Sequence, residues 1–114
     1  MTACLFCQIA QKKLNSALLY EDELAVAFAD INPQAPTHFL IIPKEHIASI
    51  NALTPEHNAL VGHLYQVAQH LAKEQGFAED GYRVCMNCNS HGGQTVFHIH
   101  LHVLAGRQMH WPPG

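Results

Sequence analysis

The sequence has few of the features that mark membrane, secreted or nucleic-acid-binding proteins. It contains no run of about 18 consecutive apolar residues, so we expect no segment that spans a membrane. The first residues lack the basic start and long apolar stretch of a secretory signal, which favours a cytoplasmic location. Only six basic residues stand against nine acidic ones, and a net charge of -3 argues against an extended nucleic acid as partner.

Cysteine and histidine are the informative parts of the composition. Four cysteines would allow two disulfides in an exported protein, but a reducing cytoplasm favours thiols or metal ligands. Ten histidines among 114 residues indicate a functional site. A chain of this length suffices for one domain, 1–114, with a core of its own.

Apolar periodicity and turn signals predict an α+β fold. A short helix is expected over 5–13, and a long one begins at Thr54-Pro55-Glu56 and ends near Gly76. A loop is expected over 89–93. The expected strands cover residues 18–20, 24–29, 38–42, 81–87 and 96–104. Because short connections favour antiparallel pairing, we predict an antiparallel sheet of about five strands with the long helix on one face.

Histidine alternates strictly with large apolar residues between Phe97 and Val103. Since strand side chains alternate between two faces, His98, His100 and His102 are predicted to share one face, while the apolar residues, Phe97 included, fill the core. A neutral imidazole is nucleophilic near neutral pH, and a protonated one stabilises oxyanions, so this row suits chemistry at a phosphate. A merely half-exposed strand and a three-histidine zinc site stay open as alternatives.

The glycine-rich start of this segment adds a second signal. Flexible backbone at Gly92-Gly93-Gln94-Thr95 can bring amide groups close to a phosphate. Together the residues from Gly92 to Leu104 resemble the signature of histidine triad (HIT) nucleotide-binding proteins. The resemblance extends over 30–38, 81–83 and 106–114, and it implies a HIT-like fold. The ending is more similar to the nucleoside phosphoramidase branch than to the dinucleoside polyphosphate hydrolase branch.

This resemblance implies a hydrolase that cleaves the P–N bond of purine nucleoside phosphoramidates without a required cofactor. His100 would attack the α-phosphorus and form a transient nucleotidyl-histidine, from which water releases a purine nucleoside monophosphate. His102 would bind a phosphoryl oxygen, and His38 would support proton movement. It also implies a homodimer in which Trp111-Pro112-Pro113-Gly114 approaches the partner's site. A non-catalytic nucleotide sensor or scaffold and a dinucleoside polyphosphate hydrolase stay open.

The resemblance also implies a nucleotide pocket. Its residues besides the histidines are Phe6, Phe28, Asp30, Ile31, Asn87, Gln94 and Thr95. Phe6, Phe28 and Ile31 would hold the purine, although apolar residues of this kind are more often plain core. Asp30 would accept hydrogen bonds from the ribose hydroxyls. Asn87 would reach the sugar or phosphate, and the other two residues would lie beside the phosphate.

A pair of cysteines near the start has the two-residue gap that lets both thiolates hold one tetrahedral ion. Some bacterial relatives have this pair, and there it resembles part of a structural zinc site. The implied ligands are Cys4, Cys7, His46 and His98. Zinc would then prevent His98 from acting as an acid at the phosphate. A site that also includes Cys85 and Cys88 is less favoured, and buried inert thiols are the other alternative.

Overall fold

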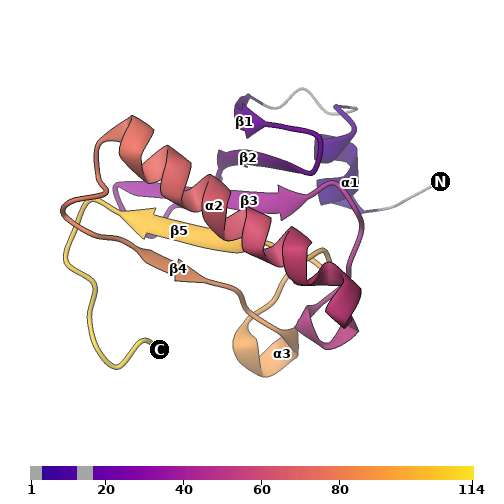
Figure 1. The fold of residues 1–114 in the computed structure, drawn as a ribbon. Coiled ribbons are helices and arrows are strands. Elements are labelled where there is room, and N and C mark those ends of the chain that lie inside the picture. Colours follow the sequence, from indigo (N-terminus) through magenta and orange to yellow (C-terminus); the bar gives the residue numbers. More distant parts are fainter. Residues whose placement is uncertain (1–3, 13–16) are drawn as a thin grey trace.

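The computed structural model describes residues 4–12 and 17–114, and it consists of one twisted sheet with helices on its faces (Figure 1). The strands are β1 (Leu18–Glu21), β2 (Ala25–Ala29), β3 (Thr37–Pro43), β4 (Arg83–Cys85) and β5 (Leu101–Ala105). The helices are α1 (Leu5–Ala10), α2 (Asn58–Gln75) and α3 (Asn89–Gly92), with short 3-10 turns at Ile50–Ala52 and Pro55–His57. None of the described helices is long and apolar enough to cross a membrane.

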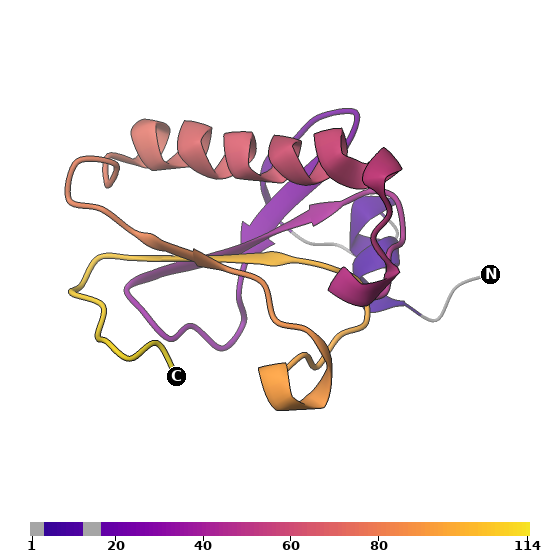
Figure 2. The same ribbon diagram turned by 60° about the horizontal axis from the view of Figure 1, so that its bottom comes forward.

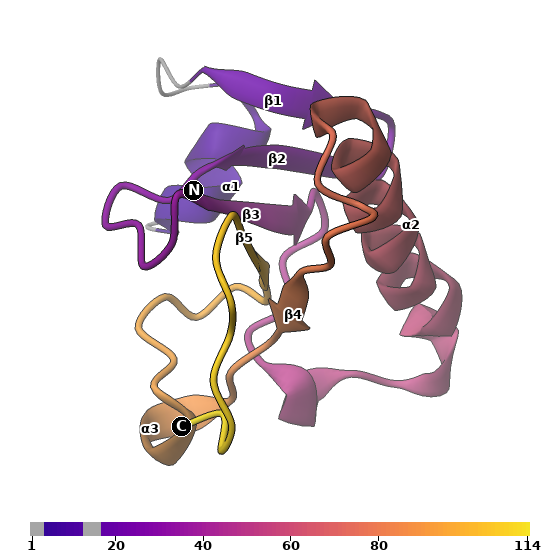
Figure 3. The same ribbon diagram turned by 90° about the vertical axis from the view of Figure 1, so that its left-hand side faces the viewer.

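The sheet has the strand order β1-β2-β3-β5-β4, and every neighbouring pair is antiparallel. This confirms the predicted α+β class and the antiparallel sheet of five strands. Although β5 is the last strand along the chain, it lies inside the sheet between β3 and β4, as Figure 3 shows from one side. The histidines on and before β5 therefore belong to the middle of the molecule.

Both faces of the sheet are covered, and β3 explains how. Phe39 and Ile41 point toward α2, where they pack with Leu64 and Leu71. The alternate residues of β3 belong to a second cluster that includes Phe6 of α1. Because successive strand residues face opposite sides, α1 and α2 lie on opposite faces, and Figure 2 shows α2 as a separate layer above the sheet. The cluster with α1 is the one that borders the site.

The segment expected as strand 96–104 differs from the prediction. β5 begins only at Leu101, and Phe97 is 52% exposed instead of lying in the core. The cause is a change of partner: the Ile99 amide donates to the carbonyl of Ile47 at 2.8 Å, outside the sheet ladder. Strict alternation of faces, which predicts a buried Phe97, therefore does not extend to this residue.

Other boundaries also differ from the predictions. The fourth strand is only three residues long, and part of the loop expected over 89–93 is the additional helix α3, which ends where Gly93 adopts φ +83°. The long helix is confirmed, but its first turn is a 3-10 turn, and Gly76 ends it with φ +86°. The first helix ends at Ala10, and residue 13 lies outside the described residues.

Candidate active site and metal centre

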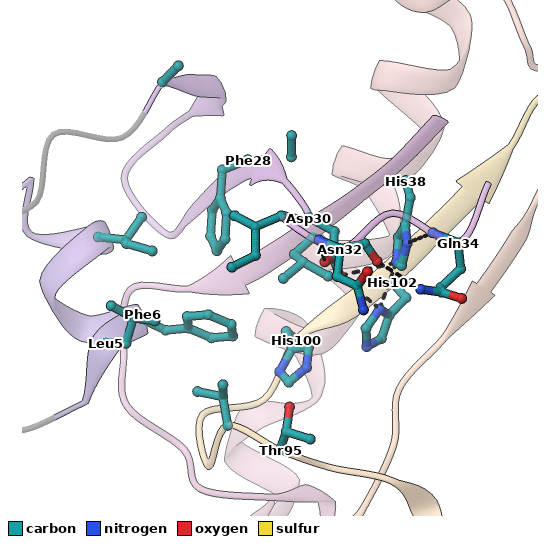
Figure 4. A pocket seen from close by; sticks show the side chains of 16 residues that line it. Leu5, Phe6, Phe28, Asp30, Asn32, Gln34, His38, Thr95, His100 and His102 are labelled. Carbon is teal, nitrogen blue, oxygen red and sulfur yellow. Dashed lines mark hydrogen bonds and ion pairs between the residues drawn. The ribbon is translucent and has the colours of Figure 1, made fainter. Parts of the chain in front are cut away.

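A cavity of about 600 Å³ opens between α1, the end of β2 and the start of β5. One part of it is apolar, and its lining there includes Leu5, Phe6, Ile9, Phe28, Leu40 and Val96. The other part is polar and is lined by Asp30, Asn32, Gln34, His38, Thr95, His100 and His102. Figure 4 shows the two groups of side chains in one view. A flat apolar group joined to a polar one fits such a cavity.

His100 lies where the two parts of the cavity meet. It is 5% exposed, and its ring contacts the ring of Phe6 edge to face at 5.1 Å. Its Nδ1 lies 2.8 Å from the carbonyl oxygen of His98. Since a carbonyl only accepts, Nδ1 must carry the proton, and in the neutral ring Nε2 keeps its lone pair. The backbone thus selects the tautomer that a nucleophilic histidine needs.

His38 and His102 form a hydrogen-bonded pair beside it. The backbone amide of Gln34 donates to His38 Nδ1 at 3.0 Å, so the neutral ring carries its proton on Nε2. That nitrogen lies 2.9 Å from Nδ1 of His102 and 3.4 Å from a carboxylate oxygen of Asp30. When His38 donates to His102, the proton of the neutral His102 ring must lie on Nε2. His102 can then donate to an anionic ligand.

Burial keeps this pair neutral. Burial lowers the pKa of His38 against the opposing effect of Asp30. Burial, with smaller contributions from His100 and His38, lowers the pKa of His102 to about 4. Both rings are therefore neutral donors at neutral pH, and they do not add positive charge to the cavity.

The predicted purine-binding residues all line the cavity, but they differ in burial. Phe6 and Phe28 are 5% and 8% exposed and contact each other at 5.4 Å, so they belong both to the core and to the cavity wall. Ile31 is fully exposed, so it is not a core residue. Asp30 accepts a hydrogen bond from the amide of Asn32 at 2.8 Å, which orients its carboxylate.

The predicted phosphate-binding residues are less uniformly placed. Thr95 lines the cavity near His100 (Figure 4). Gln94 is buried, and its amide group bonds to the backbone of Asn89, Ala48 and Val96. Its side chain therefore organises the loop itself. Within the described ranges, neither Asn87 nor Gln94 lines the cavity.

Sequence reasoning missed Asn32 and Gln34 as cavity residues. The loop that contains them was part of the resemblance, but their types carry no specific chemical signal. The important group of Gln34 is its backbone amide, which every non-proline residue has. Only the three-dimensional path of the loop shows that this amide reaches His38.

The four predicted zinc ligands come together, with all ligand atoms within 4.8 Å of one another, and the ring of His98 lies 6.0 Å from that of Phe6. The Nδ1 of His98 lies 3.4 Å and 3.5 Å from the sulfurs of Cys4 and Cys7. The Nδ1 of His46 lies 3.3 Å from Cys7 Sγ. Zinc bonds of roughly 2.0–2.3 Å in a tetrahedron require ligand separations of roughly this size.

The orientation of His98 also suits a metal. Its Nε2 donates to the carbonyl oxygen of Pro43 at 2.8 Å, which leaves Nδ1 without a proton and directed at the thiols. Metal-binding histidines commonly donate their second nitrogen in this way. Two thiolates and two neutral imidazoles form a closed structural site, and the residues therefore fit a zinc ion.

A second group with comparable spacing consists of Asp30, His38 and His102. Here the hydrogen bonds argue against a metal. His38 would have to release its Nε2 proton while Nδ1 still accepts from the Gln34 amide, which only an imidazolate can do. We therefore interpret this group as a proton relay. Within the described ranges, no ligand group unites all three triad histidines or includes Cys85 or Cys88.

Comparisons with known proteins show the family to which the chain belongs. Residues 3–111 match the family described as "Scavenger mRNA decapping enzyme C-term binding". A purine nucleoside phosphoramidase of Escherichia coli K12 is 48% identical over 105 residues, which cover 92% of this chain and 88% of that protein. A "14 kDa zinc-binding protein" of Zea mays is 49% identical over 112 residues, which cover 96% and 87%.

A solved structure extends the similarity to three dimensions. The HIT family hydrolase of Legionella pneumophila Philadelphia 1 is 53% identical, with a TM-score of 0.95 and coverage of 97% of this chain and 99% of that one. The fold and the sequence thus indicate the same family. The chain belongs to the histidine triad (HIT) family of hydrolases.

Proposed function

We propose that this protein is a purine nucleoside phosphoramidase that hydrolyses the P–N bond through a nucleotidyl-histidine. The observation that carries the proposal is His100, whose Nδ1 donates to a backbone carbonyl while its ring lines a cavity with an apolar end and a neutral donor. The similarity to a phosphoramidase of Escherichia coli supports the same substrate class. The net charge of -3 also favours a single nucleotide over a nucleic acid chain.

In the first step, Nε2 of His100 attacks the α-phosphorus. The bond from Nε2 to phosphorus forms as the P–N bond breaks, and the departing amine takes up one proton from water. The Nε2 proton of His102 would stabilise a phosphoryl oxygen, with His38 as its relay partner. Water then attacks phosphorus and releases one proton to the solvent, the P–Nε2 electron pair returns to Nε2, and the nucleoside monophosphate leaves.

The remaining residues would bind the nucleotide. We assign the purine to Phe6, Phe28 and Ile31, and the ribose hydroxyls to Asp30. Thr95 would contact the phosphate directly. Gln94 would act by shaping the loop, since its amide is already hydrogen-bonded to backbone. We retain Asn87 as a contact to the sugar or phosphate that forms on binding.

Zinc would have a structural role in this scheme. Held by its two cysteines and two histidines, the ion would attach α1 to the sheet, while His100 stays outside the ligand set. His98 would then serve as a zinc ligand, and its backbone carbonyl would accept the hydrogen bond from His100 Nδ1, so its ring would not act as an acid. We expect the protein in the cytoplasm. Cys85 and Cys88 are free cysteines, and a reducing compartment keeps cysteines in this form.

We also propose one domain and a homodimer in which Trp111–Gly114 approaches the partner's site. Trp111 is 81% exposed, so its ring is accessible for contact with a partner subunit. Sedimentation that shows only monomers at micromolar concentration would argue against the dimer.

The central test uses His100→Ala. Without the nucleophile, hydrolysis of adenosine phosphoramidate should fall by about 10⁴-fold or more, whereas AMP should still bind. Rapid quenching of the unaltered protein followed by mass spectrometry should detect AMP on His100. His70→Ala is the matched control, because His70 lies on α2 beside Glu74 and outside the cavity.

Two results would contradict the proposal. One is undiminished turnover in His100→Ala, and the other is the lack of any adduct in single turnover. Very slow turnover with tight AMP binding would favour a sensor or scaffold. Faster cleavage of dinucleoside polyphosphates than of phosphoramidates would favour the other hydrolase branch.

A further inference from the structure

Arg107 lies outside the cavity, yet it contacts the loop that controls the histidine relay. The residue follows β5, and its guanidinium donates twice to one acceptor, the carbonyl oxygen of Gln34, at 2.9 Å and 3.3 Å. A third donation goes to the carbonyl of Gln108 at 3.1 Å. Within the described ranges, Arg107 does not line the catalytic cavity. Its influence on the site must therefore pass through Gln34.

Gln34 is held at both ends. Arg107 binds its carbonyl, and its amide donates to His38 Nδ1 at 3.0 Å (Figure 4). The side chain of Gln34 adds a bond to the carbonyl of Asn32 at 3.0 Å. The guanidinium is therefore two hydrogen bonds away from the ring of His38.

The contact between the two segments is supported by packing. A Cβ atom on Gly106 would lie 2.9 Å from Cβ of Pro36, so only glycine permits this approach, and φ at Gly106 is +94°. The pairing of Thr37 with Ala105 continues the same contact into the sheet. The exposed Arg107 bond therefore closes an already packed junction instead of standing alone in solvent.

The consequence concerns protons. If the Gln34 amide moved away, the neutral ring of His38 could place its proton on Nδ1 and turn a lone pair toward His102. Nδ1 of His102 would then have to carry a proton, and its Nε2 would become an acceptor. Because a phosphoryl oxygen is itself an acceptor, an unprotonated Nε2 of His102 could not form a hydrogen bond with it.

We propose that Arg107 is a positioning residue of the active site, which fixes the tautomers of His38 and His102 by holding Gln34. The inference builds on the proposed function, because the tautomers of His38 and His102 affect catalysis only if these residues act on the phosphate. The proton positions themselves exist without substrate, however, and they can be measured separately.

The test compares Arg107→Ala and Arg107→Lys in the full chain labelled with ¹⁵N. Long-range ¹H–¹⁵N spectra distinguish protonated from unprotonated ring nitrogens. In the unaltered protein we expect the Nε2–H form of both His38 and His102. In Arg107→Ala we expect a mixture of tautomers at His38 and His102. We also expect kcat to fall by at most about tenfold, with a smaller change in KM, because misplacement of a catalytic group weakens the chemical step.

Arg107→Lys restores one donor and should recover most of the Nε2–H form, so a defect in folding alone cannot explain the series. Arg83→Gln is the matched control, because Arg83 donates to the carbonyl of His110 and does not reach Gln34. Unchanged tautomers in Arg107→Ala would overturn the inference even if the protein hydrolyses phosphoramidates. Shifted tautomers in a protein without that activity would support the inference and contradict the proposed function.

Discussion

At the scale of single residues, the site depends on which nitrogen of each histidine carries the proton. Three backbone groups decide this: the carbonyls of Pro43 and His98, and the amide of Gln34. Alternation along the sequence predicted that His100 and His102 lie side by side, and their rings are 5.0 Å apart in the structure. It could not predict the tautomers, since every residue supplies the same backbone groups.

The pKa of His102 gives a prediction at this scale. Burial is the largest cause that lowers it from 6.5 to about 4, so the unfolded chain takes up a proton first as the pH falls. The free energy of unfolding should therefore not be reduced by His102 above pH 6.5, and it should decrease as the pH is lowered from 6.5 toward about 4. NMR titration of the His102 ring should give a midpoint far below 6.5. A midpoint at the ordinary value would contradict the buried, neutral relay.

At the scale of elements, α1 connects the candidate metal site of Cys4, Cys7, His46 and His98 to the cavity. This helix has only six residues, so it cannot be stable by itself. Cys4 caps it and Cys7 lies within it, while Phe6 between them contacts Phe28 and His100. An ion held by the cysteines would thereby fix one wall of the nucleotide pocket.

Removal of the metal should therefore affect binding more than chemistry. In Cys7→Ser we expect loss of zinc binding, a lower Tm and a KM that rises more than kcat falls, because only apolar packing would then hold α1 on the sheet. Metal analysis, thermal unfolding and steady-state kinetics measure the three effects. Cys88→Ser serves as the control, since Cys88 belongs to no ligand group of the described residues. Equal Tm and KM in both variants would refute the coupling.

The elements also show where sequence patterns are insufficient. The long helix follows from apolar periodicity, and the strand β3 follows from a continuous apolar run between a proline-containing loop and Pro43; the structure confirms both. The start of β5 was misplaced because the Ile99 amide bonds to Ile47, a contact between distant segments that periodicity cannot reveal. The helix α3 was missed because its four residues, Asn89–Gly92, are typical of loops.

At the scale of the whole molecule, one carboxylate joins the sheet edge to α2. Asp22 in the turn after β1 accepts hydrogen bonds from the amides of Leu24 and Ala25, the hydroxyl of Tyr20 and the ring of His63 on α2. Burial opposes its ionisation, but these hydrogen bonds outweigh burial and lower the pKa of Asp22 to about 2.

Asp22→Asn should therefore weaken the whole fold without altering the site. We expect a loss of about 1–3 kcal/mol in the free energy of unfolding, measured in urea at neutral pH, with kcat unchanged. Because the folded pKa is lowered, the difference from the unaltered protein should be present above pH 3.8 and disappear as the pH falls toward about 2. Asp80→Asn, at an exposed position, should change stability little. An equal loss of free energy of unfolding in both variants would argue against a stabilising role of the Asp22 hydrogen bonds.

The position of β5 has a consequence for how the chain is made. β4 pairs with β5 and with no other described strand, and β5 follows the other described strands along the chain, so it is synthesised after them. The strands β1 to β3 can pair with one another during synthesis, but one edge of β3 stays unpaired until β5 has been made and inserts. A chain truncated before Leu101 would lack β5, which pairs with both β3 and β4, together with the candidate site residue His102. We therefore expect such a chain neither to complete the sheet nor to hydrolyse a substrate.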